Sequence, residues 1–281
     1  RLQRYSGLPW IADYRDLWSG NHWDARVAPF RWVESRFERR VLRGAARLTS
    51  VGSVLATRLA ALHGKPAQVI YNGFDPNDYP PSTTPEPGFN ITYIGSLYYP
   101  DQSPAPLFKA LALLNDQHAD PQSLRIQVNF LGTESAALPR LAHRYGVSNQ
   151  IRFSPAVSHQ RCLAIQAAAT ALLYLGWRDP AEGIVSAKIF EYLGAGRPIL
   201  AVGPPGGEVS SILQGCGLAN LTEDPQEIAK HLRLWLRELN STGLVTSLRP
   251  SAAAADYTRE AQAGRLAGLL DRQVELGGVR S

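Results

Sequence analysis

The sequence predicts an α/β protein built from doubly wound parallel sheets, and two observations lead to this prediction. Short apolar runs typical of buried strands alternate with segments of helical periodicity along nearly the whole chain. Glycine and proline, with 24 and 20 residues, are well represented, as expected where many short turns join strands to helices. Strands that alternate with helices usually form parallel sheets covered on both faces, and such sheets bind ligands at the carboxyl ends of their strands.

The individual elements follow from this alternation. Each predicted strand is a short, mostly apolar run, and each predicted helix places apolar residues three and four positions apart. Strands are expected at 10–14, 48–51, 68–71, 90–94, 125–131, 151–153, 171–175, 198–202 and 217–221. Helices are expected at about 31–43, 53–63, 104–118, 134–145, 158–169, 186–194, 207–214, 225–239 and 252–274.

A proline-rich segment divides these elements into two groups. Residues 76–88 contain five prolines, which cannot continue a helix or a central strand, so a stiff linker is expected. Three predicted strands precede the linker, and the region after it is long enough for a six-stranded domain. We therefore expect an incomplete first domain, a linker, a second domain and a C-terminal helix that packs back on the first domain, at 1–78, 79–88, 89–250 and 251–281.

Composition restricts the class of protein. The chain has 281 residues and a formal net charge of +5, which suits anionic ligands or an acidic membrane surface and gives no reason to expect nucleic acid. Cys162 and Cys216 lack the spacing of zinc ligands, so no metal site is expected. Two cysteines in a chain of this length favour a reducing compartment. We therefore expect a cytoplasmic protein, with the inner face of the membrane as the place of any lipid contact.

The sequence also bears on membrane insertion, secretion and the natural start of the chain. No run approaches the roughly 18 consecutive apolar residues of a membrane-spanning helix. The amino end has no apolar signal-peptide core. The sequence contains no methionine, so we treat it as a fragment that lacks its natural start.

The run from Val185 to Leu200 is the most informative stretch for function. It predicts a loop, a helix that begins near Ser186, a glycine stop and a buried strand. A helix start offers unpaired N–H groups and partial positive charge, which suit a phosphate. Lys188 lies in the first turn, and Glu191 could accept hydrogen bonds from sugar hydroxyls. The alternative is an ordinary surface ion pair between Lys188 and Glu191, because residues three apart on a helix face each other.

This segment resembles the donor-site signature of family 4 glycosyltransferases, which have the GT-B fold of two Rossmann-like domains. The resemblance rests on Ser-Ala-Lys-Ile-Phe followed by Glu-Tyr-Leu-Gly-Ala-Gly-Arg-Pro-Ile-Leu, and on Val-Ile-Tyr-Asn-Gly-Phe-Asp at 69–75. It implies that Glu191 binds the ribose and that the amides of Ser186 and Ala187 hold the diphosphate. It also implies an acceptor-side domain at 1–78 and a donor-binding domain at 89–250.

The resemblance further implies a reaction. A sugar would pass from a nucleotide-diphosphate sugar to an acceptor hydroxyl with retention of configuration. The donor is a substrate, and no cofactor is expected. The acceptor would be a sugar, a lipid-linked molecule or a small molecule. The chain contains no Asp-x-Asp, which disfavours a metal-dependent transferase of the other common fold.

Two further segments of the second domain belong to this expected donor site. A strand runs into Gly95-Ser96, where glycine lets the backbone approach a phosphate, although an ordinary turn is an equal alternative. The family usually has an arginine directly after this glycine and a lysine six residues beyond that arginine. Ser96 and Gln102 stand at those places here, so either Lys188 substitutes or transfer activity is lost.

The loop before the expected donor helix carries weaker predictions. The family pattern places two glutamates eight residues apart, and the position eight before Glu191 is Gly183. Glu182 is one residue away from that position. Either Glu182 takes the role of the first glutamate with an adjusted loop, or this chain lacks the first glutamate. The backbone of Gly183, Ile184 and Val185 is expected to line the phosphates. The loop at 203–208 lacks the P-loop pattern and is interpreted as a turn without a ligand.

Asp13, Arg15 and Asp16 form a charged cluster in the first domain. They lie at and just after the carboxyl end of the strand at 10–14. The segment resembles the Asp-x-Arg-Asp-x-Trp of many family 4 members, which favours a role for Asp16 and Arg15 near the acceptor or the transferred sugar. The alternative is a structural Arg–Asp pair that caps the loop.

The basic helix at 31–43 also has two interpretations. Val33, Phe37 and Val41 lie on one face, a pattern that can dock on anionic lipid. The same pattern is produced by a solvated face over a core stripe, which is the default and the one the sequence favours.

Three other functions compete with glycosyl transfer. A nucleotide-sugar-binding protein without transfer activity would explain the missing basic pair. A dinucleotide oxidoreductase would need a Gly-x-Gly-x-x-Gly fingerprint, which is absent. A nucleic-acid binder would show a steep salt dependence that a net charge of +5 does not suggest.

Overall fold

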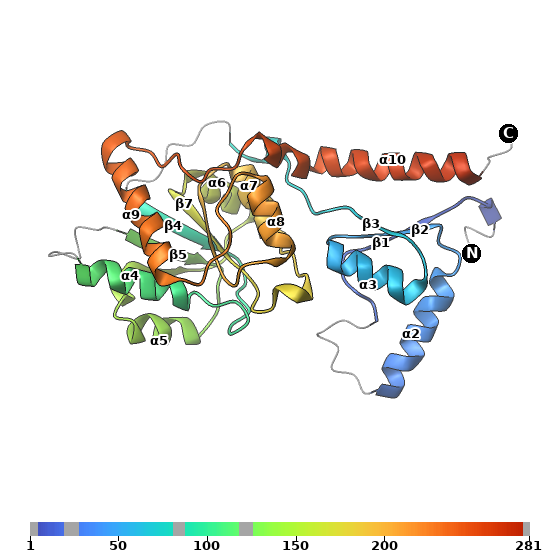
Figure 1. Ribbon diagram of the computed structural model, residues 1–281, viewed down its shortest axis with the longest axis horizontal. Helices are drawn as coiled ribbons and strands as arrows, with labels where there is room; N and C mark the ends of the chain where they lie inside the picture. The colour runs from blue at the N-terminus through green and yellow to red at the C-terminus, as the bar shows by residue number, and fades with distance from the viewer. Residues whose placement is uncertain (1–4, 20–27, 81–87, 118–125, 278–281) are drawn as a thin grey trace. The chain divides into compact units, whose positions relative to one another are not determined.

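The computed structural model describes residues 5–19, 28–80, 88–117 and 126–277, so most of the predicted linker, 81–87, lies outside the described residues. The chain forms two compact units (Figure 1). Unit 1 comprises residues 1–73 together with 259–281, and unit 2 comprises residues 74–258. Each unit has its own parallel sheet, which bears out the predicted α/β class.

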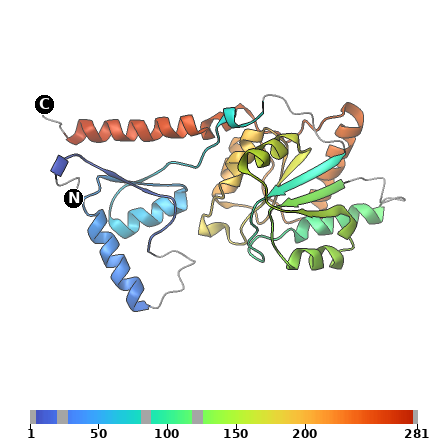
Figure 2. The same ribbon diagram turned by 180° about the vertical axis from the view of Figure 1, so that it is seen from behind.

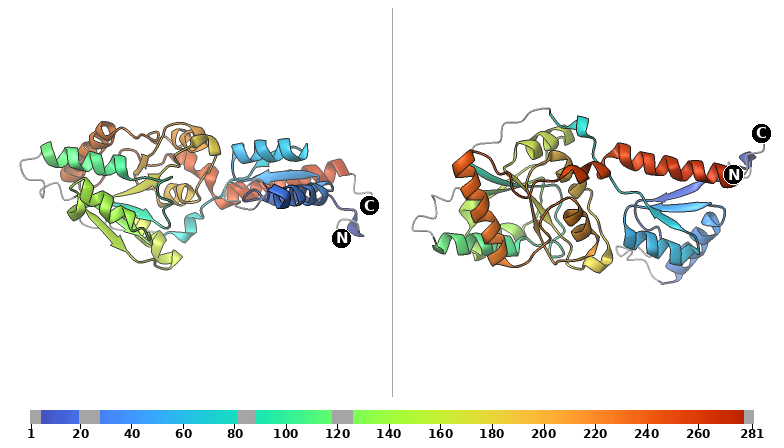
Figure 3. Two further views of the ribbon diagram at one scale, coloured as in Figure 1. Left: turned by 90° about the horizontal axis from the view of Figure 1, so that it is seen from below. Right: turned by 45° about the horizontal axis from the view of Figure 1, so that its top comes forward.

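Unit 1 contains a three-stranded parallel sheet in the order β1-β2-β3. Figure 3 shows the three strands together with their helices. Its elements are β1 (Ile11–Tyr14), α2 (Ala28–Leu42), β2 (Arg47–Ser50), α3 (Ser53–His63), β3 (Ala67–Val69) and α10 (Arg259–Gly277). The helix α10 belongs to this unit because Gln262 accepts a hydrogen bond from the Tyr71 amide at 2.9 Å and Leu269 is buried.

Unit 2 contains a five-stranded parallel sheet in the order β6-β5-β4-β7-β8. Its strands are β4 (Phe89–Ile94), β5 (Ile126–Leu131), β6 (Ile151–Ser154), β7 (Ala171–Leu175) and β8 (Ile199–Val202). Its helices are α4 (Ala105–Gln117), α5 (Ala137–Arg144), α6 (His159–Ala168), α7 (Lys188–Ala195), α8 (Gly207–Gly215) and α9 (Pro225–Thr242). Short 3-10 turns η1 (Pro76–Asp78), η3 (Ser148–Gln150), η4 (Pro180–Glu182) and η5 (Ala252–Tyr257) complete the unit.

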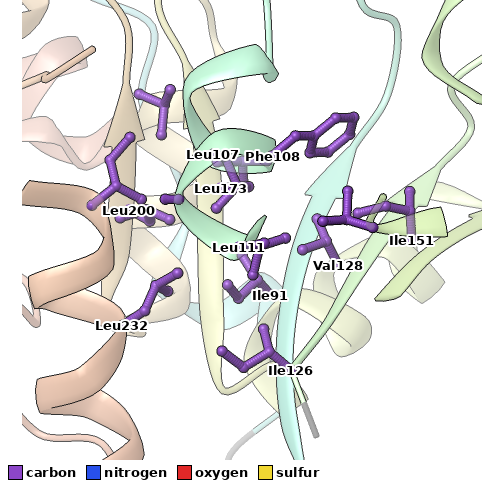
Figure 4. Close-up of a cluster of buried hydrophobic side chains, with 14 of the residues drawn as sticks. Ile91, Leu107, Phe108, Leu111, Ile126, Val128, Ile151, Leu173, Leu200 and Leu232 are labelled. Carbon is purple, nitrogen blue, oxygen red and sulfur yellow. The ribbon is translucent and has the colours of Figure 1, made fainter. Parts of the chain in front are cut away.

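Helices cover both faces of the sheet of unit 2. In Figures 1 and 2, α4 and α5 lie on one face, and α6 and α7 lie on the other. Side chains at alternate strand positions point to opposite faces, so β4 sends Ile91 and Tyr93 toward the α4 face. Figure 4 shows the resulting core, in which Leu107, Phe108 and Leu111 of α4 pack against the strands. Burial of these side chains is the main stabilising contribution in the unit.

Two predicted elements differ from the structure. The run 217–221 is not a strand; its neighbour Thr222 makes only an isolated bridge to Val202, so the sheet has five strands and not six. Gly217 has φ +73°, which turns the chain, and Leu218 and Leu221 are buried by packing without strand pairing. The predicted helix 252–274 is divided at Thr258, which has extended geometry between η5 and α10.

The predicted core stripe of α2 is wrong. Val33, Phe37 and Val41 are 58%, 55% and 42% exposed. The face that packs on the sheet carries Glu38 and Leu42 instead, which are 1% and 3% exposed. Helical spacing correctly predicted that Val33, Phe37 and Val41 share a face. It did not show which face is buried, because hydrophobicity gives no reason to expect Glu38 in the core.

Candidate functional site

The topology of unit 2 places a switch point at the ends of β4 and β7. The chain leaves β4 toward β5 and β6 on one side and later returns to β7 and β8 on the other. Loops after β4 and β7 therefore diverge, and ligands of doubly wound sheets bind at such a switch point. Gly95 follows β4 and Gly176 follows β7, so the predicted segments at 95–96 and 183–191 reach the same end of the sheet.

Lys188, the first residue of α7, connects these segments. Its Nζ donates to the carbonyl oxygen of Ser96 at 2.7 Å and to the Tyr93 hydroxyl at 3.1 Å. The ammonium group lies 4.9 Å from the centre of the Tyr93 ring, a cation–π contact. An ammonium has three donors, so within the described residues one N–H of Lys188 is left for a ligand.

Gly95 leaves room for this lysine. Its φ of +94° is unfavourable for other residues, and a Cβ at this position would lie 3.1 Å from Cε of Lys188. Burial lowers the pKa of Lys188 from 10.5 to about 8, and the negative charge of Glu191 opposes this shift. The lysine is thus a partly desolvated cation at the switch point, and among the described residues of unit 2 no anion pairs with it directly.

The start of α7 lies slightly later than predicted. The helix begins at Lys188 with Ala187 as its N-cap, so Ser186 precedes the helix. The Ser186 carbonyl accepts from the Ile189 amide at 3.1 Å, and its amide lies beside the buried Tyr174 hydroxyl. Within the described residues, the amide of Ala187 has no hydrogen-bond partner. The helix start therefore offers a ligand the amide of Ala187. The amide of Ser186, which was also predicted to bind the diphosphate, lies beside the Tyr174 hydroxyl and is less available.

Glu191 lies one turn further along α7 and is held by an amide and an imidazole of α6. Its Oε2 accepts from Gln166 Nε2 at 3.0 Å, and its Oε1 is 3.3 Å from His159 Nε2. The side chain of Glu191 is 29% exposed. No ion pair within 4.0 Å joins Glu191 to Lys188, both of which the structure describes. The predicted surface pair between them therefore does not form, and each keeps its charge for other interactions.

His159 and Gln166 were not predicted as members of this site. Both lie on α6, which packs against α7. Gln166 is fully buried within an otherwise largely small and apolar helix face, and a buried amide at such a position is a signal that it has a polar partner. His159 follows Ser158, the N-cap of α6, so it stands at a strand-to-helix loop at the carboxyl side of the sheet.

The predicted loop residues before α7 lie in a tight turn. Glu182 ends η4, and Gly183 caps it with φ +69°. Gly183 and Ile184 line a small crevice with Gly206 and Gly207, while Glu182 is outside its lining. Val185 is 8% exposed, so its side chain is buried. The loop at 203–208, interpreted from sequence as a turn without a ligand, thus borders the same crevice as Gly183.

Gln102 has a structural role at the place where the family usually has lysine. Its Nε2 donates to the carbonyl oxygen of Leu175 at 2.8 Å, and the side chain is buried. This hydrogen bond ties the loop after β4 to the end of β7. Ser96, at the place of the arginine, contributes its carbonyl oxygen to both Lys188 and the Tyr93 hydroxyl. Lys188 therefore reaches this loop from α7, and Arg178, in the loop after β7, reaches it through Asp101, whose Oδ1 lies 3.7 Å from Arg178 Nε.

The candidate residues of unit 1 form their own cluster. Arg15 Nε donates to Asp13 Oδ2 at 2.9 Å, and its Nη1 donates to Asn72 Oδ1 at 3.3 Å. Thr49 donates to the other Asp13 oxygen at 2.7 Å. Asp16 is exposed. The structural Arg–Asp pair foreseen as the alternative is present, and Arg15 and Asp16 belong to a different unit from Lys188 and Glu191.

Within the described parts of the chain, no group of three histidine, cysteine or acidic residues lies together in a way that could hold a metal ion. None of the helices that the structure describes is both long and apolar enough to cross a membrane.

Comparison with known proteins establishes the fold of the chain. No protein-family model and no curated protein matches the sequence. Solved structures with a similar fold are GT-B glycosyltransferases. Anabaena HepE in complex with UDP and glucose has 18% identity and a TM-score of 0.64, covering 96% of this chain and 73% of that chain. A Rickettsia africae glycosyltransferase has 11% identity and a TM-score of 0.67, covering 97% and 72%.

A third structure extends the comparison. WaaG, a glycosyltransferase involved in lipopolysaccharide biosynthesis, has 15% identity and a TM-score of 0.57, covering 97% of this chain and 76% of that chain. At these identities the similarity defines the fold. The chain has a GT-B-like α/β fold, with three parallel strands in the described residues of the first unit and five in those of the second.

Proposed function

We propose that this chain is a family 4 glycosyltransferase that moves a sugar from a nucleotide-diphosphate sugar to an acceptor hydroxyl. The observation that carries the proposal is the placement of Lys188 at the switch point, with Gly95 and Ser96 beside it and Glu191 one turn away. A cation, a glycine-bounded loop and an N-cap amide together suit a diphosphate. A carboxylate that is 29% exposed and positioned by a buried amide suits the hydroxyls of a ribose.

The proposed roles follow the predicted site. Lys188, the Ala187 amide and the backbone amides of Ser96, Ile184 and Val185 hold the diphosphate, with Ser186 beside them. The Gly95 and Gly183 amides already donate to the carbonyl oxygens of Leu131 and Pro180, so these glycines contribute space and not donors. Glu191 accepts hydrogen bonds from the ribose. Preorganised donors on the diphosphate stabilise the negative charge that develops as the sugar bond breaks. The reaction proceeds with retention and without a metal ion.

Other residues are proposed for the sugar and the acceptor. Glu182 contacts the transferred sugar after a shift of its loop, and Asp16 and Arg15 act on the acceptor side. The acceptor is a sugar, a lipid-linked molecule or a small molecule, as in polysaccharide, glycolipid or natural-product glycosylation. The proposed compartment is the cytoplasm.

A second candidate function is nucleotide-sugar binding without transfer. It is favoured by Gln102, whose amide is turned into the protein at a place where the family usually has lysine. In this case Lys188 would hold the diphosphate, but a single cation would not stabilise the leaving group enough for turnover.

One experiment separates the two functions. Binding of UDP, GDP and dTDP is measured by calorimetry, with NAD as the control for a dinucleotide site. For each nucleotide that binds, the corresponding nucleotide sugar is then added with a radiolabelled sugar, and release or transfer of the sugar is followed. Because HepE was solved with UDP, UDP is the first ligand to test. Binding with slow donor hydrolysis or transfer supports the transferase, and binding without release of sugar supports the second function. Binding of NAD alone, or of none of these, contradicts both.

A further inference from the structure

Unit 1 contains a cavity between α10 and the sheet. In Figures 1 and 2, α10 runs along one side of the strands and α3 lies on the other. The cavity has a volume of about 480 Å³ and is bounded by the start of β2, by residues 66–69 and by the second half of α10. Small-molecule sites in proteins have volumes of about 300–1,000 Å³, so this cavity is large enough for a ligand.

The cavity lies at the end of the sheet away from the strand ends that carry the candidate residues of unit 1. Arg47, the first residue of β2, pairs in register with Ile11, the first residue of β1. Arg47 therefore marks the amino ends of the strands, whereas Asp13 and Arg15 lie at the carboxyl end of β1. Ligands of the proposed reaction gather at carboxyl ends. The cavity is thus separate from the site proposed for that reaction.

Two arginines that line the cavity carry unpaired charges. Arg47 is half-buried and Arg272, on α10, is exposed. Within the described residues, neither side chain has an ion pair or a hydrogen bond. Among the described residues that line the cavity, none is acidic. Two unpaired guanidinium groups at one cavity repel each other, so an anion held between them would be stabilised by both.

A buried amide indicates that the ligand has further polar groups. Gln273 lines the cavity and is only 8% exposed, yet its side chain has no hydrogen-bond partner among the described residues. Most buried amides are hydrogen-bonded to protein or water, so an unpartnered one at a cavity is a candidate ligand contact. Gln68 of β3 offers a second amide. Val69 and Leu269 form an apolar floor, and Leu269 is 3% exposed.

We propose that this cavity binds a small, polyhydroxylated phosphate monoester, the chemical class of the sugar phosphates. Arg47 and Arg272 hold the phosphate, because guanidinium groups match its oxygens in charge and geometry. The amides of Gln68 and Gln273 donate to and accept from hydroxyl groups, and the apolar floor packs against the C–H face of the ligand.

Other occupants fit the lining less well. Inorganic phosphate would leave the two amides and the apolar floor without a partner. A fatty acid would bring its chain against the same amides, and a nucleotide base finds no aromatic side chain among the described lining residues. The proposal does not depend on the reaction in unit 2.

The test measures binding of glucose 6-phosphate to the whole chain by calorimetry, with inorganic phosphate and glucose as partial ligands. Arg272→Gln and the double variant R47Q/R272Q remove the phosphate contacts, and Gln273→Leu removes the buried amide while keeping its bulk. Arg265→Gln, also exposed on α10 but outside the lining, is the matched control for charge. Lys188→Gln shows whether the probe binds at the proposed donor site instead.

We expect glucose 6-phosphate to bind and to raise the thermal midpoint, because the ligand joins α10 to the sheet. Arg272→Gln should weaken this binding about tenfold or more, and R47Q/R272Q should abolish it. Gln273→Leu should weaken glucose 6-phosphate about fivefold and change inorganic phosphate less than about twofold. The Arg265 and Lys188 variants should stay within about twofold of wild type, and circular dichroism shows that each variant is folded.

Four results would overturn the proposal. The wild-type chain does not bind glucose 6-phosphate, or inorganic phosphate binds as tightly, so that the amides and the floor are unused. Lys188→Gln abolishes the binding, which would place the probe in unit 2. Arg265→Gln weakens binding as much as Arg272→Gln does, which would indicate a general effect of charge on α10.

Discussion

The carboxyl ends of the two sheets carry the same kinds of residue but use them differently. In unit 1, Arg15 and Asp13 pair directly at 2.9 Å, so their charges cancel within the protein. In unit 2, Lys188 is held by a carbonyl oxygen and a phenol, and Glu191 is held by an amide and an imidazole. The carboxyl ends of the two sheets thus differ: the charges of Arg15 and Asp13 are paired with each other, while the charge of Lys188 has no paired carboxylate and can interact with a ligand.

This difference teaches how to weigh charged residues at strand ends. A charge that is satisfied by an opposite charge contributes structure, while one that is positioned by neutral groups keeps its field for a bound molecule. Burial raises the free energy of such an unpaired charge, as the lowered pKa of Lys188 indicates. The four predictions below test this contrast, from the largest expected effect to the smallest.

Lys188→Gln should have the largest effect on nucleotide binding. The substitution removes a charge-assisted hydrogen bond to the diphosphate, which contributes about 1.5–3 kcal/mol, so UDP affinity should fall about 10- to 150-fold. Calorimetry with UDP and with inorganic pyrophosphate checks this, and both ligands should be affected. Lys109→Gln on the exposed face of α4 is the matched control and should bind as wild type. Equal affinities of the Lys188 variant and wild type would show that Lys188 does not face the diphosphate.

Glu191→Ala should weaken UDP binding while sparing pyrophosphate. The variant loses acceptors for ribose hydroxyls, and a loss of about 1–2 kcal/mol corresponds to roughly 5- to 30-fold in UDP affinity. Pyrophosphate has no ribose, so its affinity should change less than about twofold. Glu227→Ala, on the exposed face of α9, controls for the loss of one negative charge. Equal losses for UDP and pyrophosphate would assign Glu191 to an electrostatic effect on Lys188 and not to the ribose.

The pH dependence of binding should report the unpaired lysine. Burial lowers the pKa of Lys188 to about 8, and only the protonated form attracts a diphosphate. Raising the pH from 7 to 9 therefore removes the charge from most molecules, and UDP affinity should fall about tenfold. Lys188→Arg stays charged over this range, so its affinity, whatever its value at pH 7, should be flat. A wild-type profile as flat as that of the arginine variant would contradict the assignment.

The sequence predicted the fold better than the partners within the site. Strand and helix periods are local properties, which is why most elements appeared at their expected places. The run 217–221 failed because an apolar segment looks alike whether it pairs as a strand or only packs. The stripe on α2 failed for a related reason: spacing shows that residues share a face, but a buried glutamate held by Tyr14 decided which face turned inward.

The candidate site shows the same limit. The spacing of Lys188 and Glu191 along one helix was readable, and it allowed both a surface pair and a ligand site. The choice depended on residues far away in the sequence: Ser96 and Tyr93 for the lysine, and Gln166 for the glutamate. Such contacts arise only when the sheet brings β4 beside β7, so no local pattern contains them.

Arg15→Gln should have the smallest effect and completes the contrast between the two units. The Arg15 and Asp13 side chains are 49% and 40% exposed, so their pair contributes about 0.2–1 kcal/mol to stability. The thermal midpoint should therefore shift only slightly, and UDP affinity should stay within about twofold of wild type, because the pair lies in unit 1 and leaves no charge for the donor. Asp13→Asn is the companion variant: it frees Arg15 from its carboxylate while keeping a hydrogen-bond acceptor. If Arg15→Gln weakened UDP binding as strongly as Lys188→Gln, paired and unpaired charges at strand ends could not be distinguished by their partners, and the assignment of the donor site to unit 2 alone would fail.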